Sequence, residues 1–124
     1  MPSDHKMMQH HKLVMPEHIN PHGFLFGGYL LQWVDEMAYI TAMLDLPGYK
    51  LVTMGMDNVE FKVGIHSGEI LRFDIQQHRL GHTSVRYHVG VYGELKSEHP
   101  EVMLFETTIT FVSVDEQGGA LQIG

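Results

Sequence analysis

A single helical stretch precedes a long run of strands, and this order limits the folds that the chain can adopt. From about Gly28 to Leu44, apolar and small residues recur at spacings of three and four, so that they share one side of a helix: Leu30, Leu31, Val34, Ala38, Thr41 and Ala42. Pro47 and Gly48 then supply a stop signal. At about 1.5 Å per residue, this helix extends over about 25 Å.

Beyond Gly48 the period changes to two, the repeat of a β-strand. Alternating residues predict strands over about 69–77, 83–93 and 103–112, and a fourth segment is rich in β-forming residues but interrupted at Asp57-Asn58 (50–63). A short first strand is predicted before the helix, over 8–15, and the breaks at 66–69, 80–83 and 96–101 are typical of turns. The sequence therefore predicts five strands, with a sixth as an open alternative, and four of them follow the helix.

The predicted strands are longer than the usual 5 or 6 residues, so a sheet built from them must curve around the shorter helix. Short turns between consecutive strands favour antiparallel pairing. One helix covers only one face of such a sheet. We expect the other face to carry apolar side chains as well, and a second copy of the chain to cover it. The expected fold class is α+β, with one helix on one side of an antiparallel sheet.

The chain has 124 residues and neither repeats nor linkers, so we expect a single domain over 1–124, with a flexible arm over 1–10 as an alternative to an ordered start. Its net charge of −7 argues against a nucleic-acid partner, which needs clustered cations. The absence of Cys excludes disulfides and thiolate chemistry. Because no signal peptide and no apolar run long enough to cross a membrane is visible, we expect a cytoplasmic protein with no membrane partner.

The segment from Asn20 to Glu36, NPHGFLFGGYLLQWVDE, is the most informative for chemistry. Gly27 and Gly28 lead into the predicted helix, where small residues let a ligand approach the backbone. The first N–H groups of a helix have no internal acceptor and lie at the positive end of its dipole. They therefore suit an oxygen that becomes negative during a reaction.

Asp35 follows Gly28 by two helical turns. One interpretation is a solvated surface acid beside Glu36, as most helical carboxylates are. The other is a half-desolvated base or nucleophile, because Asp35 lies at the edge of the apolar side of the helix. Asn20, before Pro21, is favoured as a turn residue, and an amide that orients a water or a carbonyl is its alternative role.

Other catalytic patterns are missing. The ten His include no HxxxH pair on a helix, so we expect no catalytic metal. Ser84 has no GxSxG context, and neither GxGxxG nor a P-loop occurs. We expect no cofactor.

Four segments in the same order resemble the acyl-CoA thioesterases of the hotdog-fold superfamily. They are NPHGFLFGGYLLQWVDEMAYITA, MGMDNVEFK with its following SGE turn, LGHTSVRYHVGVYGE and TTITFVSVDEQG, and the resemblance as a whole covers roughly residues 11–118. The resemblance implies a long central helix wrapped by a curved antiparallel sheet. It also implies hydrolysis of acyl-CoA, with CoA as part of the substrate, and homodimers joined edge to edge with active sites at the interface. Many members are trimers of dimers.

By position, the resemblance makes Asp35 the catalytic carboxylate, Asn20 its loop partner and Gly28 the amide that polarises the thioester carbonyl. It suggests five further residues for substrate binding: Gly27, His22, Lys62, Thr83 and Ser84.

The chain departs from the family pattern at two places. Phe24 stands where the family often has a small polar residue, which is expected to reshape the acyl pocket. Val63-Gly64 replaces a basic residue and a proline, which weakens the expected contact with the CoA phosphates.

Two other functions stay open. A hotdog dehydratase or hydratase needs a His paired with a carboxylate, for which His22 is the nearby candidate. A non-catalytic acyl-CoA-binding regulator usually carries an added DNA-binding segment.

Overall fold

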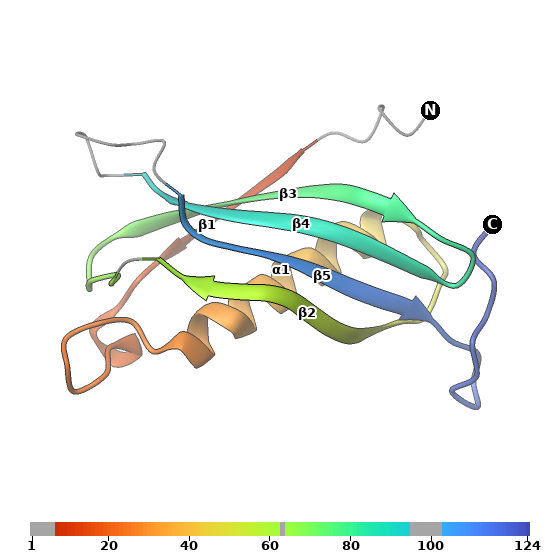
Figure 1. Cartoon of the computed structure of the whole chain (residues 1–124), viewed down its shortest axis with the longest axis horizontal. Coiled ribbons are helices and arrows are strands. Elements are labelled where there is room, and N and C mark those ends of the chain that lie inside the picture. Colours follow the sequence, from red (N-terminus) through yellow and green to blue (C-terminus); the bar gives the residue numbers. More distant parts are fainter. Residues whose placement is uncertain (1–6, 63, 95–102) are drawn as a thin grey trace.

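The computed structural model describes residues 7–62, 64–94 and 103–124 (Figure 1). One long helix, α1 (Gly27–Asp45), lies on one side of a five-stranded antiparallel sheet. The strand order is β1-β3-β4-β5-β2, in which the elements are β1 (Met8–Leu13), β2 (Leu51–Phe61), β3 (Ile70–Leu80), β4 (Ser84–Gly93) and β5 (Met103–Ser113). The predicted α+β class and the single helix before four strands are confirmed.

The start of the described chain is paired rather than free. Met8, Gln9 and His10 in β1 lie opposite residues 73–75 of β3, so this part of the alternative arm belongs to the sheet. A short 3-10 turn, η2 (Pro16–His18), follows β1 and leads into the loop before α1. The turn predicted over 96–101 lies outside the described residues.

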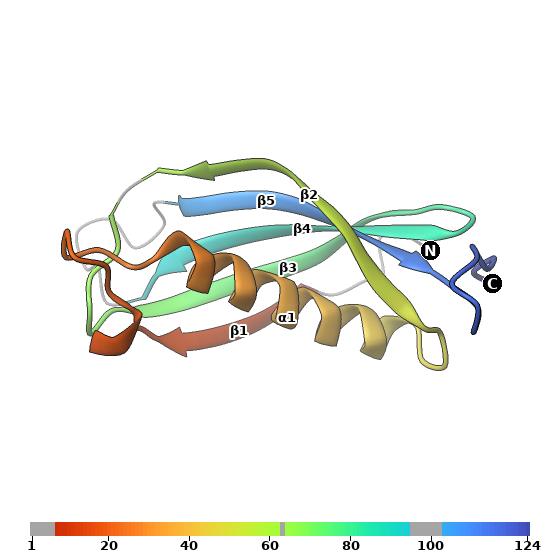
Figure 2. The same cartoon turned by 90° about the horizontal axis from the view of Figure 1, so that it is seen from below.

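Figure 2 shows α1 lying along one face of the sheet. The core side chains fill the space between this helix and the inner face of the sheet. Val34, Ala38 and Ala42 of the helix are fully buried, and the two alanines let the helix axis approach the strands closely. The inward residues of the central strands are also fully buried, among them Phe73, Ile75, Val85, Tyr87, Phe105, Ile109 and Phe111. Successive side chains of each strand point alternately to this inner face and to the outer face, which explains the period of two in the sequence.

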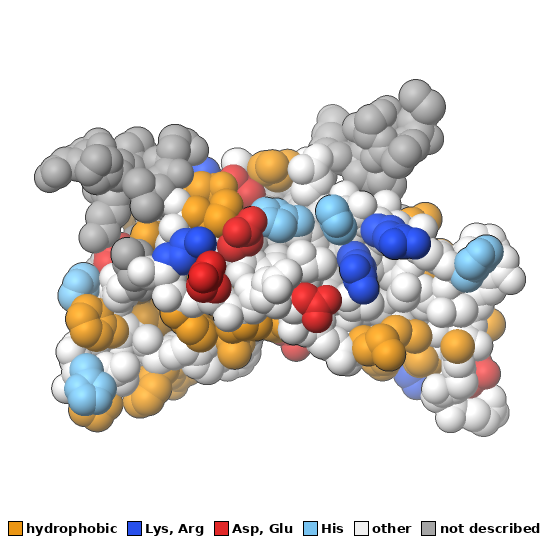
Figure 3. Space-filling model, viewed as in Figure 1, with side chains coloured by type: hydrophobic (Ala, Val, Ile, Leu, Met, Phe, Trp, Pro, Cys, Tyr) orange, Lys and Arg blue, Asp and Glu red, His pale blue; other side chains and the backbone are white. Residues whose placement is uncertain are grey.

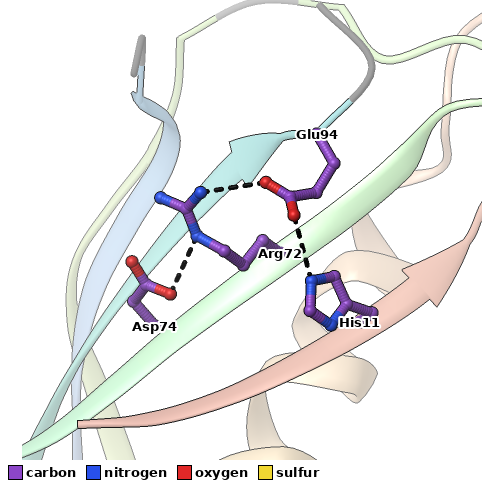
Figure 4. Close-up of polar contacts among 4 residues, drawn as sticks. All are labelled: His11, Arg72, Asp74 and Glu94. Carbon is purple, nitrogen blue, oxygen red and sulfur yellow. Dashed lines mark hydrogen bonds and ion pairs between the residues drawn. The ribbon is translucent and has the colours of Figure 1, made fainter. Parts of the chain in front are cut away.

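The outer face of the sheet is mainly polar, and the expectation of an apolar outer face is wrong. Figure 3 shows acidic, basic and His side chains across its middle. On β3, Arg72 Nε donates to Asp74 Oδ1 at 3.0 Å, and its Nη1 donates to Glu94 Oε1 at 2.9 Å (Figure 4). His11 Nε2 lies 3.2 Å from Glu94 Oε2, so His11 of β1 also contacts this cluster of Arg72, Asp74 and Glu94. Because nearly all the alternating apolar residues fall on the inner face, few remain for the outer one.

Exposed apolar side chains gather instead along α1 and the edge strand β2. They include Ile40, Met43, Leu44, Val52 and Met54. β2 pairs with β5 alone and is interrupted by a register shift between Asp57 and Glu60, where Asn58 adopts a positive φ of 58°. The interruption predicted at Asp57-Asn58 is therefore a β-bulge on an edge strand.

No helix within the described ranges is both long enough and apolar enough to cross a lipid bilayer.

Candidate active site

Asp35 lies on α1 with a half-buried side chain, as its place at the edge of the apolar side predicts. Thr53 Oγ1, on the edge strand β2, donates a hydrogen bond of 2.6 Å to Asp35 Oδ1. A hydroxyl bond to a carboxylate at this distance is of the strong, charge-assisted kind. Asp35 and Thr53 line a hollow of about 330 Å³ with Gln32, Glu36 and Tyr39. The carboxylate is thus held in one orientation and stays open to a small molecule.

Thr53 is the residue that sequence analysis missed. It lies eighteen positions after Asp35 (53 − 35 = 18). Its strand shows no clear alternation of buried and exposed residues. Its only sequence signal is a hydroxyl within an otherwise apolar stretch, LVTMGM. The packing of β2 against the helix, which the sequence does not reveal, brings the two side chains together.

The start of α1 leaves backbone donors free of intrahelical partners. The helix begins at Gly27, and the N-cap residue Phe26 provides no side-chain cap. The Phe26 carbonyl accepts from the N–H groups of Tyr29 and Leu30, at 3.2 and 3.4 Å. The N–H groups of Gly27 and Gly28 come earlier in the first turn, where a helix offers no acceptor. They form a positive end suited to a negative oxygen.

The two glycines meet different surroundings. A Cβ atom on Gly27 would lie 2.9 Å from Cζ of Phe61, so this residue is small because a ring packs on it. A Cβ atom on Gly28 would meet nothing within 4 Å, and Gly28 is exposed. Gly27 is therefore packed against Phe61, whereas the backbone of Gly28 is accessible from outside.

Asn20 organises the loop before the helix. Its Oδ1 accepts from the backbone N–H groups of His22 at 2.9 Å and Phe24 at 3.1 Å. Its own N–H donates to the Phe24 carbonyl at 2.7 Å, and Gly23 completes the turn with a φ of 91°. The geometry matches the turn role that the sequence favours for Asn20. The side-chain Nδ2 group makes no hydrogen bond within the described part of the chain, so it is the part of Asn20 available to a ligand.

The remaining predicted residues are spread over the molecule. His22 is exposed, and Lys62 Nζ pairs with Glu60 Oε1 at 3.0 Å. Thr83 and Ser84 lie at the turn between β3 and β4, at the opposite end of the sheet from the start of α1 (Figure 1). The register places Thr53 opposite Phe111, and Phe111 opposite Val85. Two strand spacings, about 10 Å, therefore separate Thr53 from this part of β4.

The structure also separates Gly28 from Asp35. The two residues are seven positions apart on one flank of the helix, which corresponds to about 10 Å along its axis. Direct attack by Asp35 on a carbonyl bound at the Gly28 N–H needs a much shorter separation. Within one chain, Asp35 and the Gly28 amide are therefore too far apart to act on the same carbonyl group.

Within the described ranges, no group of three or more His, Asp or Glu side chains is placed to hold a metal ion.

Comparison with known proteins gives a consistent result. The sequence model of the Thioesterase superfamily matches residues 22–96. An uncharacterized acyl-CoA thioester hydrolase of Zymomonas mobilis is 25% identical over 111 residues, covering 90% of this chain and 74% of that protein.

Two solved structures show the same fold. An acyl-CoA hydrolase from Staphylococcus aureus, in complex with butyryl coenzyme A, coenzyme A and coenzyme A disulfide, superposes with a TM-score of 0.84 and 28% identity, covering 94% of this chain and 71% of that one. A hexameric hotdog fold thioesterase of Campylobacter jejuni gives a TM-score of 0.80 and 28% identity, covering 93% and 88%. Structures of the S. aureus enzyme with an aspartate, an asparagine or a threonine changed to alanine match similarly.

Proposed function

The chain belongs to the thioesterase superfamily, and from this premise we propose that it hydrolyses acyl-CoA thioesters to a free carboxylic acid and CoA. The observation that carries the proposal is the half-buried carboxylate of Asp35, held by Thr53 on the helix flank that also presents the open amide of Gly28. The family membership predicted from sequence motifs is confirmed by the match over 22–96. Acyl-CoA as the substrate follows the names of the relatives.

The S. aureus variants support the choice of residues. The aspartate, asparagine and threonine changed in that enzyme are the residue types of Asp35, Asn20 and Thr53. The asparagine precedes the aspartate by fifteen positions there, as Asn20 precedes Asp35 here (35 − 20 = 15). The threonine follows the aspartate by seventeen positions there and by eighteen here. We therefore assign Thr53 to the site beside the two residues predicted from the sequence.

In the proposed mechanism, the thioester carbonyl oxygen accepts a hydrogen bond from the Gly28 N–H, which stabilises the negative charge that develops on it. One such donor is worth about 10²–10³ in rate. Asp35 either removes a proton from a water held with the Asn20 amide, or attacks the carbonyl carbon itself to form a mixed anhydride that water then hydrolyses. In both routes the C–S bond breaks and CoA leaves as a thiolate, which needs no strong acid.

Thr53 acts as a positioning residue in this mechanism. Its hydroxyl donates to Oδ1 of Asp35 and fixes the rotation of the carboxylate, so that Oδ2 remains for the water or the carbonyl carbon. A fixed orientation matters because small displacements of a catalytic group lower rates strongly.

We propose a homodimer as the active unit. The separation of about 10 Å between Gly28 and Asp35 calls for a second chain that brings its own Asp35 near the first chain's Gly28. β2 is an edge strand with exposed apolar residues such as Val52 and Met54, and it suits antiparallel pairing with the β2 of another copy. A trimer of dimers is consistent with the hexameric C. jejuni thioesterase.

The substrate-binding residues predicted from the resemblance stay proposals with different requirements. His22 lies in the loop before α1, and Gly27 is the first residue of the helix, so both are near Gly28. Lys62 forms an ion pair with Glu60 and would have to leave it to bind a CoA phosphate. Thr83 and Ser84 lie at the far end of the sheet and need the second copy to come near a site. Cytoplasmic localisation also stays a prediction.

The positions of the histidines bear on the dehydratase or hydratase alternative. In the described part of the chain, the His–carboxylate pairs are His11–Glu94 and His88–Glu106, both on the outer face of the sheet. The contact of His22 is a backbone bond to Asn20. A His22→Ala variant with no effect on activity counts against this alternative.

The test is release of free thiol from short, medium, long and aromatic acyl-CoA by the purified chain. Asp35→Asn is expected to lose nearly all activity, and Glu17→Gln, an exposed acid in η2, is the matched control that retains it. Hydrolysis that survives in Asp35→Asn refutes the assignment of this carboxylate. Tight acyl-CoA binding without turnover supports the non-catalytic regulator instead.

A further inference from the structure

An apolar hollow of about 480 Å³ lies beside the start of α1. Its wall consists of Phe24, Leu25, Gly27, Leu30, Phe61, Gly64 and Ile65, together with one charged residue, Lys62. Gly27 belongs to the first turn of the helix, so the hollow adjoins the backbone amides proposed to bind the carbonyl oxygen. A thioester bound at these amides has the acyl chain on one side and the pantetheine arm of CoA on the other. The hollow is therefore placed to receive one of these two groups.

Phe24 owes its position to a glycine on another segment. A Cβ atom on Gly64 would overlap Cδ1 and Cε1 of the Phe24 ring, so the ring occupies the space that any larger residue at 64 would fill. The same ring lies 5.1 Å, centroid to centroid, from the ring of His66. The two departures from the family pattern, Phe24 and Gly64, are thus in direct contact with each other.

The backbone beneath Phe24 is anchored, although the side chain is 41% exposed. Its N–H donates to Asn20 Oδ1 at 3.1 Å, and its carbonyl accepts from the Asn20 N–H at 2.7 Å. The next N–H, of Leu25, donates to the Ile65 carbonyl at 2.7 Å. These bonds hold the ring as a wall of the hollow instead of leaving it on a loose loop.

We propose that the hollow takes the acyl chain of the substrate and that Phe24, seated over Gly64, limits the length of the chain it accepts. The inference rests on the proposed thioesterase function and names the specificity-determining residue. The acyl chain is the better occupant because the pantetheine arm of CoA carries amides that need hydrogen-bond partners. Most of the lining is apolar, and its one charged side chain, Lys62, is already paired with Glu60 at 3.0 Å. An acyl chain has only apolar surface to bury.

The experiment compares kcat/KM for a series of straight-chain acyl-CoA substrates in the full chain and in Phe24→Ala. Removing the ring extends the hollow, and the ratio of kcat/KM for long to short chains is expected to rise by about fourfold for each methylene group newly accommodated. Phe26→Ala is the matched control. It removes a comparably exposed ring from the same loop that does not line the hollow, and the ratio is expected to stay unchanged.

A second pair of variants tests the contact with Gly64. Gly64→Ala forces the Phe24 ring to move, so it is expected to change the chain-length ratio when Phe24 is present and to leave it unchanged in the Phe24→Ala background. Phe24→Leu, a smaller apolar replacement, gives the same direction of change as Phe24→Ala if the latter folds poorly.

The outcomes separate the two claims. Hydrolysis with the same chain-length profile in the wild type, Phe24→Ala and Phe24→Leu refutes the role of Phe24 and leaves the proposed function standing. Equal effects of Gly64→Ala with and without Phe24 also refute the inference. Absence of hydrolysis of any acyl-CoA by the wild type contradicts both.

Discussion

Two regions of one helix each hold an aspartate that accepts a short hydroxyl bond. Asp35 accepts from Thr53 Oγ1 at 2.6 Å, and Asp45 accepts from the Tyr87 hydroxyl at 2.7 Å. Both side chains are half-buried. The bond type and the burial of the carboxylate therefore do not distinguish a candidate catalytic group from a structural one.

The surroundings of the two carboxylates make the difference. Thr53 belongs to the edge strand β2 and lines an open hollow, whereas Tyr87 is fully buried on the central strand β4. Burial raises the pKa of Tyr87 above its usual value, so the phenol stays protonated and serves as a donor to Asp45. Asp45 is the last residue of α1. It therefore lies at the negative end of the helix dipole, which does not stabilise a negative carboxylate. Its function is to satisfy a buried hydroxyl.

The largest expected effect comes from exchanging each carboxylate for an amide. Asp35→Asn is expected to lower kcat/KM by about 10²–10⁴-fold, the usual worth of a general base, while Asp45→Asn stays within a few-fold of the wild type. Thiol release from one good acyl-CoA substrate measures both. Comparable losses in the two variants contradict the distinction between the regions.

Removing the two hydroxyl donors sharpens the comparison. Thr53→Val is expected to lower kcat by about 10- to 100-fold because Asp35 loses its fixed orientation, with Thr53→Ser restoring most of the activity. Tyr87→Phe is expected to leave kcat unchanged and to lower the free energy of unfolding by about 1–2 kcal/mol, since Asp45 loses its donor. Denaturant unfolding and steady-state kinetics on the same preparations separate the two effects. A Tyr87→Phe variant with reduced kcat and unchanged stability speaks against the scheme.

Sequence reasoning succeeded where one face of an element is buried. The alternation of Val85, Tyr87, Val89 and Val91 predicted β4 because each of these side chains is fully buried against α1. The same reasoning failed for the outer face of the sheet. The residues that alternate with the buried apolar ones, such as Arg72 and Asp74, are already polar in the sequence, and they pair with each other on that side.

The site was predictable only in part for a similar physical reason. Asp35 and Gly28 lie on one helix, so their spacing predicts their common flank. Thr53 reaches Asp35 from an edge strand whose residues are nearly all exposed and show no alternation. The contact of Phe24 with Gly64 joins two loops, and loops carry no period from which a contact can be inferred.

Adding a methyl group to each glycine at the start of α1 gives the next smaller effect. Gly27→Ala is expected to lower the free energy of unfolding by about 1–3 kcal/mol, because the new Cβ would press on the Phe61 ring. Gly28→Ala meets no neighbour and is expected to stabilise the helix by about 0.5–1 kcal/mol, while kcat/KM falls about tenfold or more as the methyl group crowds the proposed oxyanion donor. Thermal unfolding with parallel assays measures both. Loss of stability in Gly28→Ala, or full activity, contradicts the assignment of that amide.

The smallest effect concerns a third carboxylate, Glu94, which lies on the outer face of the sheet (Figure 4). Hydrogen bonds from His11 and Arg72 hold the pKa of Glu94 below its ordinary value of 4.5. A carboxyl whose pKa is lowered by folding stabilises the protein above its unfolded pKa, and this contribution disappears as the pH falls through the lower folded pKa. The difference in Tm between the wild type and Glu94→Gln is therefore expected to be small at pH 7 and to shrink as the pH falls below 4.5, the ordinary pKa of the group. A difference that grows as the pH falls contradicts this account.

Because Glu94 lies on the outer face, remote from the hollow of Asp35, kcat in Glu94→Gln is expected to equal that of the wild type at pH 7.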